Sequence, residues 1–287
     1  LMEARKAIAE NLSARFNVNA FADEFYITCG AAAALCCVFG ALSETDKTEF
    51  IAIAPYFPEY KVFVEGRGAK LRVVPADTVD FQINFDALCS LINENTAGII
   101  VNSPNNPSGR VYSKETLKKL AEILEAKSNE FGHPIYIISD EPYRELVYGN
   151  VDVPFIPTIY RNTVVCYSYS KSLSLPGERI GYVLVNSDCV NAKEVYYSIC
   201  GAGRSLGFVC APALFQHMIP SCLGYTSDLE TYKKNRDILY NALTSYGYTL
   251  AKPDGAFYLF MKALGNSALE FSEKAKEYEL LLVPSDS

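Results

Sequence analysis

The segment SYSKSLSLPGERIG, residues 168–181, joins two apolar runs and decides how the rest of the chain is interpreted. The preceding run, residues 163–167, and the following run, residues 180–185, are rich in β-branched residues and are typical of buried strands. Lys171 therefore lies on the connection between two core strands, where an amine is costly unless its charge is lowered or used. An isolated lysine there usually extends to water. The nearby hydroxyl groups and Arg179 favour a second interpretation, in which the connection holds a phosphate while the lysine amine performs carbonyl chemistry.

Three earlier strand ends carry further candidate side chains. Apolar runs at residues 49–54, 98–102 and 134–138 predict buried strands. The first run is followed by an aromatic ring suited to stacking, Phe57 or its neighbour Tyr56. The second is followed by Asn106, which is held between rigid residues, and the third by Asp140. Core packing and turn formation are the ordinary roles of the first two types. A carboxylate at the end of an apolar strand needs a cationic partner or a function, whereas the adjacent Glu141 is expected to be a loop charge.

The order of the predicted elements indicates the fold class. Strands alternate with helices as far as residue 185, which predicts an α/β fold with a mostly parallel, doubly wound sheet. Such sheets bind ligands at the carboxyl ends of their strands. Helical patterns dominate afterwards, and residues 257–261 predict one more strand. A change of composition near residue 224 predicts a large domain, residues 1–224, and a smaller α+β domain, residues 225–287.

A possible anion site precedes these strands. Residues 24–28 predict a short strand, Gly30 permits a tight turn, and an alanine-rich helix begins directly after it. The free backbone N–H groups of a helix N-terminus attract anions. Close packing of small residues explains the same pattern, and the spacing matches neither the dinucleotide fingerprint nor the P-loop.

Composition excludes several classes of function. The 287 residues are 49% hydrophobic and 21% charged, with a net charge of −7, which fits a soluble globular protein and argues against a nucleic-acid surface. No run approaches the roughly 20 apolar residues of a membrane span. Nine cysteines without paired spacing predict a reducing, cytoplasmic location, and two histidines make a zinc site improbable.

Taken together, these segments resemble the fold type I pyridoxal phosphate (PLP)-dependent aminotransferases of class I/II, the group that includes aspartate aminotransferase. The most specific match is Ser-x-x-Lys followed eight residues later by Arg and then Gly, formed here by Ser168, Lys171, Arg179 and Gly181. The segments NNPSG, residues 105–109, and SDEPY, which ends at Tyr143, follow in specificity. The matches cover nearly the whole chain.

The resemblance implies a role for each candidate residue. Lys171 would form the internal aldimine with PLP and then act as the general base. Asp140 would pair with the protonated pyridine nitrogen and keep the ring a good electron sink. Asn106 and Tyr143 would hydrogen-bond the phenolic oxygen, and Phe57 would stack on the ring. The phosphate would be held by Gly30, Ala31, Ala32, Ser168, Ser170 and Arg179.

The implied reaction moves an amino group between an L-amino acid and a 2-oxo acid. Two alternatives stay open at this point: a PLP-dependent β-lyase of the carbon–sulfur type, and a non-catalytic PLP- or effector-binding domain. The resemblance also implies a homodimer, whose interface Arg204 and Ser205 could reach unless they lie on a surface loop. We expect the chain to be incomplete at both ends, because the family's N-terminal segment and its carboxylate-binding arginine have no counterpart in it.

Overall fold

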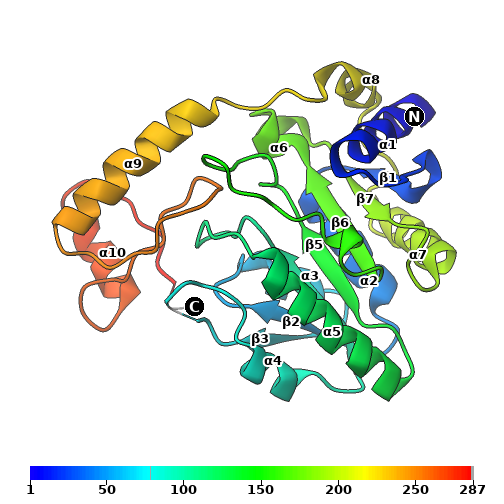
Figure 1. Cartoon of the computed structure of the whole chain (residues 1–287), viewed down its shortest axis with the longest axis horizontal. Coiled ribbons are helices and arrows are strands. Elements are labelled where there is room, and N and C mark those ends of the chain that lie inside the picture. Colours follow the sequence, from blue (N-terminus) through cyan, green and yellow to red (C-terminus); the bar gives the residue numbers. More distant parts are fainter. Residues whose placement is uncertain (78, 286–287) are drawn as a thin grey trace.

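A seven-stranded sheet forms the centre of the computed structural model, which describes residues 1–77 and 79–285 (Figure 1). The strand order is β1-β7-β6-β5-β4-β2-β3, and β7 runs antiparallel to both of its neighbours while the other pairs are parallel. The predicted α/β fold with a mostly parallel sheet is therefore confirmed. The strands are β1 (Phe25–Thr28), β2 (Glu49–Ile53), β3 (Lys70–Val74), β4 (Thr96–Asn102), β5 (Tyr136–Asp140), β6 (Thr163–Ser168) and β7 (Gly181–Val185).

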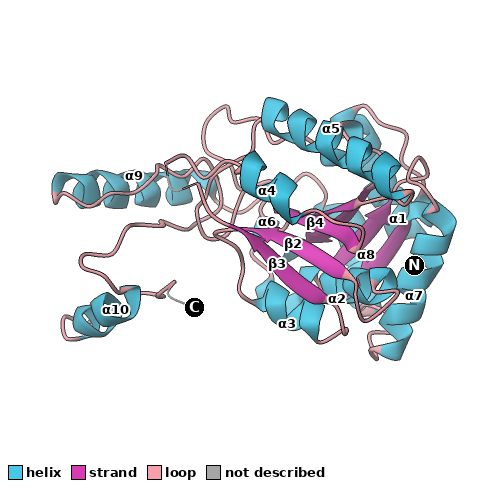
Figure 2. Ribbon diagram, turned by 90° about the horizontal axis from the view of Figure 1, so that it is seen from below, coloured by secondary structure: helices cyan, strands magenta, loops and turns pink. Residues whose placement is uncertain are grey.

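Helices cover both faces of this sheet, with α4 (Phe85–Leu91) and α5 (Lys114–Phe131) on one face and α2 (Ala31–Leu42), α3 (Glu59–Glu65) and α7 (Ala192–Ser205) on the other (Figure 2). Side chains alternate between the faces along each strand. Ile99 belongs to the core beneath α5, whereas its neighbour Ile100 belongs to the core beneath α2. The inner strands are buried on both faces and mainly apolar, as expected for a parallel sheet, whereas the edge strand β3 is largely exposed and includes Lys70 and Arg72.

A third core lies where α1 (Met2–Phe16) and α8 (Ala213–Cys222) pack beside β1, β6 and β7. Beyond α8 the chain leaves the sheet and forms α9 (Leu229–Ser245) and α10 (Ala268–Lys276), which lie apart from it (Figure 1). The domain division at residue 224 stays a prediction. Across the described residues, no helix combines the length and apolarity needed to cross a membrane.

Two local interpretations differ from the structure. Arg204 and Ser205 lie in the last turn of α7, which removes the surface-loop alternative left open for them. Gly203, in the same turn, allows α7 to pack closely, because a Cβ there would lie 2.3 Å from the Tyr26 hydroxyl oxygen. Residues 257–261, which are within the described range, form no strand and contribute only an isolated bridge between Leu250 and Met261. The aromatic side chains there pack against connecting segments instead, Phe257 against Tyr143 and Phe260 against Phe81.

Candidate active site

The predicted site residues follow strands that are neighbours in the sheet. Asn102 at the end of β4 pairs with Asp140 at the end of β5, and Asp140 pairs with Cys166 of β6. Since these strands are parallel, the segments that leave them meet at one edge. The Asn106 loop, Asp140 and the short helix α6 (Tyr169–Ser172), which contains Lys171, therefore lie side by side.

Asp140 is buried, with 4% of its surface exposed. Its Oδ2 atom accepts a hydrogen bond from the Tyr60 hydroxyl at 2.5 Å, whereas Oδ1 has no hydrogen-bond partner in the described part of the chain. Burial raises the pKa of Asp140 to about 7; the Tyr60 hydrogen bond opposes this rise and the Glu141 charge adds to it. An uncompensated buried carboxyl group of this kind is suited to a cationic ligand atom.

Tyr60 is a site residue that sequence reasoning missed. It lies in the first turn of α3 and is fully buried. Phe57 packs edge-on against its ring at 5.7 Å between centroids, and Tyr56 stacks parallel to it at 6.3 Å. The available signal was a tyrosine three residues beyond Phe57, since a buried tyrosine hydroxyl almost always has a polar partner.

Glu141 is not the loop charge that the sequence predicted. It is as buried as Asp140, and it forms an ion pair with Arg144 and accepts a hydrogen bond from Ser139 Oγ at 2.5 Å. The Arg144 guanidinium lies 4.8 Å from the Tyr167 ring centroid and donates to the Tyr182 hydroxyl at 3.2 Å. The prediction was wrong because the cation that pairs with Glu141 is Arg144, three residues later in the chain.

Asn106 and Tyr143 lie close together: the Asn106 side chain is near enough to the Tyr143 hydroxyl to lower its pKa, against the larger effect of burial. The hydroxyl oxygens of Tyr143 and Tyr258 are 2.8 Å apart. Burial, and after it Tyr258, raises the pKa of Tyr143 well above its ordinary value, so this hydroxyl stays protonated and able to donate. Tyr258 is a second residue that the sequence reasoning missed, because it fell within the wrongly predicted strand.

Asn102 fixes the Asn106 loop to the neighbouring strand. Its Oδ1 accepts from the Asn106 backbone N–H at 2.6 Å, and its Nδ2 donates to the Asp140 carbonyl oxygen at 2.8 Å. The buried Asn102 side chain therefore links the loop that carries Asn106 to the strand that carries Asp140.

The predicted anion site is assembled from two distant segments. Arg179 donates to Ser170 Oγ at 3.1 Å, and Ser170 Oγ lies 2.8 Å from Ser168 Oγ. Arg179 also donates to the Cys29 carbonyl oxygen, which places it over Gly30, where a Cβ would lie 2.4 Å from Nη2. Gly30 precedes the N-terminus of α2, whose first backbone N–H groups, those of Ala31 and Ala32 among them, have no partner within the helix. Two hydroxyls, a guanidinium and a helix N-terminus thus converge as an oxyanion site requires.

Lys171 projects from α6, whose first turn is capped by the Ser168 side chain. Its Nζ atom lies 5.3 Å from the centroid of the Phe257 ring. Phe257 also packs edge-on against Tyr143, with 5.7 Å between the centroids. The lysine amine therefore lies beside aromatic side chains at the edge that carries Tyr143 and Asp140.

The family model for aminotransferase class I and II matches residues 1–286. The chain belongs to the class I and II aminotransferases. It is 29% identical over 98% of its length to a probable aspartate aminotransferase of Methanocaldococcus jannaschii, of which it covers 74%. It superimposes on a crystal structure of an amino transferase from Eubacterium rectale with a TM-score of 0.97 and 59% identity, covering 99% of this chain and 71% of that one. For aspartate aminotransferase of Thermus thermophilus the TM-score is 0.86 and the identity 25%, with 99% and 77% of the two chains covered.

The protein is therefore an enzyme that transfers amino groups, and the matched proteins give no support to the β-lyase or effector-binding alternatives. In this aminotransferase, the sequence-predicted residues form three contacting groups at one sheet edge: Asp140 beside the Tyr60 ring system, Asn106 with Tyr143, and Arg179 with the serines over Gly30. Arg204 and Ser205 lie elsewhere, at the end of α7.

Proposed function

We propose that this aminotransferase binds PLP at Lys171 and moves an amino group between an L-amino acid and a 2-oxo acid. The observation that carries the proposal is Asp140 Oδ1, a buried carboxyl oxygen without a hydrogen-bond partner in the described residues. A protonated pyridine nitrogen would provide both the missing hydrogen bond and the missing positive charge. That cation would stabilise the ionised form of Asp140, whose pKa burial raises to about 7.

The other groups fit the remaining parts of PLP. The Arg179, Ser168, Ser170 and Gly30 site supplies donors for a phosphate. Asn106 and the protonated Tyr143 hydroxyl supply donors for the phenolic oxygen. We assign the ring-stacking role to Phe57, which is anchored against Tyr60. Bound PLP supplies a ring that withdraws electrons from the substrate Cα.

The residues of this chain would then handle the protons. Asp140 would hold the proton at the ring nitrogen, because a buried carboxylate strongly favours a charge-assisted hydrogen bond. The Lys171 amine, once neutral, would remove and return the proton at the substrate Cα. Phe257, within reach of Lys171, would exclude water from that position.

Names among the relatives support an amino acid substrate: they include a probable aspartate aminotransferase, an aromatic-amino-acid aminotransferase of Thermococcus litoralis and a probable N-acetyl-LL-diaminopimelate aminotransferase of Bacillus subtilis. The proposal also includes a cytoplasmic homodimer. Family membership supports the dimer, and nine cysteines that are all free support a reducing compartment.

The test is reduction of the PLP-loaded protein with borohydride, followed by peptide mass analysis. We expect one PLP per chain, fixed to Lys171, and amino-group transfer to 2-oxoglutarate from at least one of aspartate, tyrosine or phenylalanine. Lys171→Ala should carry no covalently attached PLP after reduction, and its rate of amino-group transfer should fall about 10⁴-fold or more. Lys118→Ala, an exposed position on α5, should behave as the parent. A reducible adduct of equal stoichiometry in Lys171→Ala would overturn the assignment.

A further inference from the structure

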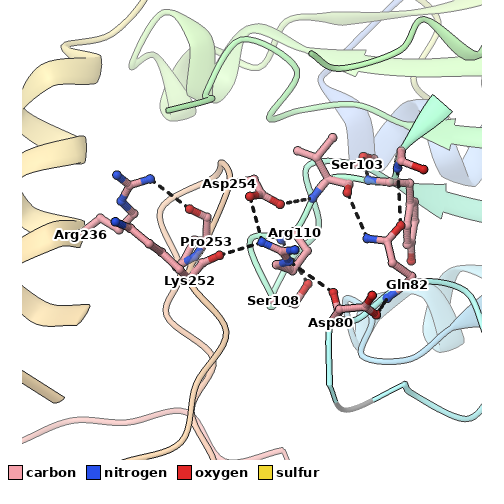
Figure 3. Close-up of polar contacts among 12 residues, drawn as sticks. Asp80, Gln82, Ser103, Ser108, Arg110, Arg236, Lys252, Pro253 and Asp254 are labelled. Atoms are coloured by element: carbon pink, nitrogen blue, oxygen red, sulfur yellow. Dashed lines mark hydrogen bonds and ion pairs between the residues drawn. The ribbon is translucent and has the colours of Figure 1, made fainter. Parts of the chain in front are cut away.

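The turn formed by residues 253–256 lies between two loops of the site and contacts both. On one side lies the Asn106 loop, which continues into Arg110, and on the other lies the segment from Tyr143 to Tyr148. Figure 3 shows the contacts around Asp254 and Arg110, where this turn meets the Asn106 loop. The turn comes from the part of the chain that follows α9, so it joins that part to the sheet edge.

The Asp254 carboxylate fastens the turn to the Asn106 loop. Its Oδ1 atom pairs with Arg110 Nη1 at 2.9 Å, and its Oδ2 atom accepts from the Val111 backbone N–H at 3.1 Å. Arg110 Nη1 also donates to the Lys252 carbonyl oxygen at 3.0 Å. About a quarter of each charged side chain is exposed, so the pair is partly shielded from water and held by backbone groups on both sides.

Backbone groups bring the turn and the loop into direct contact. The Gly109 carbonyl oxygen accepts from the backbone N–H groups of both Asp254 and Gly255, each at 2.9 Å. Gly109 has a φ of +70°, and a Cβ there would lie 2.6 Å from the Pro253 Cβ. No side chain fits between the two segments, so a displacement of one must be transmitted to the other.

The same turn is fastened to the Tyr143 segment. The Ala256 N–H donates to the Leu146 carbonyl oxygen at 2.8 Å, and the Tyr148 N–H donates to the Asp254 carbonyl oxygen at 2.9 Å. Ala256 is fully buried in a cluster with Tyr143 and Leu146. Two residues further on, Tyr258 places its hydroxyl 2.8 Å from that of Tyr143.

We propose that Asp254 and Arg110 are positioning residues for amino-group transfer, because their ion pair sets the turn that keeps Asn106, Tyr143 and Tyr258 in mutual register. This inference rests on the proposed function, in which Asn106 and Tyr143 donate to the phenolic oxygen of PLP. The pair itself is not among the residues proposed to hold PLP. Its effect is transmitted through Gly109 on one side and Leu146 on the other.

The decisive variant is Asp254→Ala, compared with Asp254→Asn, which keeps one oxygen for the Val111 N–H. For Asp254→Ala we expect PLP to stay fixed on Lys171 while kcat falls about tenfold or more with little change in KM, as small misplacements of site groups produce. The pH midpoint of the visible absorption band of the bound PLP should rise, because weaker donors to the phenolic oxygen disfavour its anionic form. Asp254→Asn should show a smaller change in both.

A second measurement uses the unloaded protein and does not depend on PLP. In hydrogen exchange, Asp254→Ala should speed exchange in both residues 104–111 and residues 143–148, since both rely on the turn. The control is Glu125→Ala, which removes a surface ion pair with Arg161 and should change neither exchange nor the absorption midpoint. Unchanged exchange in the 143–148 segment of Asp254→Ala would overturn the inference, as would an unchanged midpoint. Failure of the parent to fix PLP at Lys171 would instead refute the proposed function, and the exchange result would still decide the coupling of the loops.

Discussion

Asp140 and Glu141 are adjacent carboxyl groups at the end of β5, and each is 4% exposed, yet their surroundings differ completely. Glu141 faces Arg144 and Ser139, and the Arg144 guanidinium in turn lies over the Tyr167 ring. Asp140 faces the Tyr60 hydroxyl and has one oxygen without a partner among the described residues.

The difference separates a structural charge from a functional one. Burial alone disfavours the Arg144 cation, but the Glu141 carboxylate outweighs it and raises the pKa of Arg144, so the guanidinium stays charged. Among the described residues Asp140 forms no ion pair, and burial raises its pKa to about 7. An uncompensated buried carboxyl group is costly unless a ligand completes it, which is why we assign the proposed site role to Asp140 and not to Glu141.

The largest expected effect comes from breaking the structural charge pair. Arg144→Met removes the cation and leaves the Glu141 carboxylate buried without it, which should lower the free energy of unfolding by about 3–5 kcal/mol. Urea unfolding of the unloaded protein measures this loss. The double variant Glu141→Gln with Arg144→Met should recover part of the stability, because no buried charge is then left over. Equal stability of the single and double variants would show that the pair is not the cause.

The second effect concerns Asp140 and depends on pH. The pKa of Asp140 is about 7 in the folded chain and about 3.9 when unfolded, so between these values the folded state holds the extra proton. The free energy of unfolding should therefore fall as pH rises from about 4 to about 7, by up to about 4 kcal/mol, and then level off. Asp140→Asn should remove this part of the slope. Urea midpoints of both proteins at pH 5 and pH 8 measure the difference.

The PLP-loaded Asp140→Asn variant tests the functional side of the comparison. It should still fix PLP on Lys171, but α-proton exchange of a bound amino acid should fall about 10²- to 10³-fold, because a neutral amide cannot stabilise a positive ring nitrogen. Normal exchange in this variant would remove the role proposed for Asp140, whatever the outcome of the unfolding experiment.

Much of this arrangement could be predicted from the sequence, because strand ends are visible in it. The apolar runs before Asn106, Asp140 and Lys171 indicate parallel strands, and parallel strands bring their carboxyl ends to one edge. The residue types at those ends then indicate the chemistry. For Glu141 the same logic misled, since adjacency to the strand end does not reveal which way a side chain points.

The missed residues depend on tertiary contacts that no local pattern encodes. Tyr60 acts because α3 turns its hydroxyl back toward β5, and Tyr258 acts because the turn at residues 253–256 carries it to Tyr143. The surface-loop alternative for Arg204 and Ser205 fails because Gly203 belongs to α7 and permits its close approach to Tyr26. The positions of these residues depend on contacts with partners that are distant in sequence, and not on local composition.

The smallest expected effect distinguishes the two oxygens of Asp140. In the parent protein, the hydrogen bond from Tyr60 to Oδ2 lowers the pKa of Asp140. Tyr60→Phe removes this bond, so the pKa of Asp140 should rise further, by about one unit if the bond contributes about 1.4 kcal/mol. The pH at which the unfolding free energy stops falling should move upward by that amount. Tyr56→Phe, on the ring stacked against Tyr60, leaves the Tyr60–Asp140 bond intact and serves as the control. If both variants titrate like the parent, the hydroxyl of Tyr60 does not set the charge of Asp140, and the contrast with Glu141 rests on the absent cation alone.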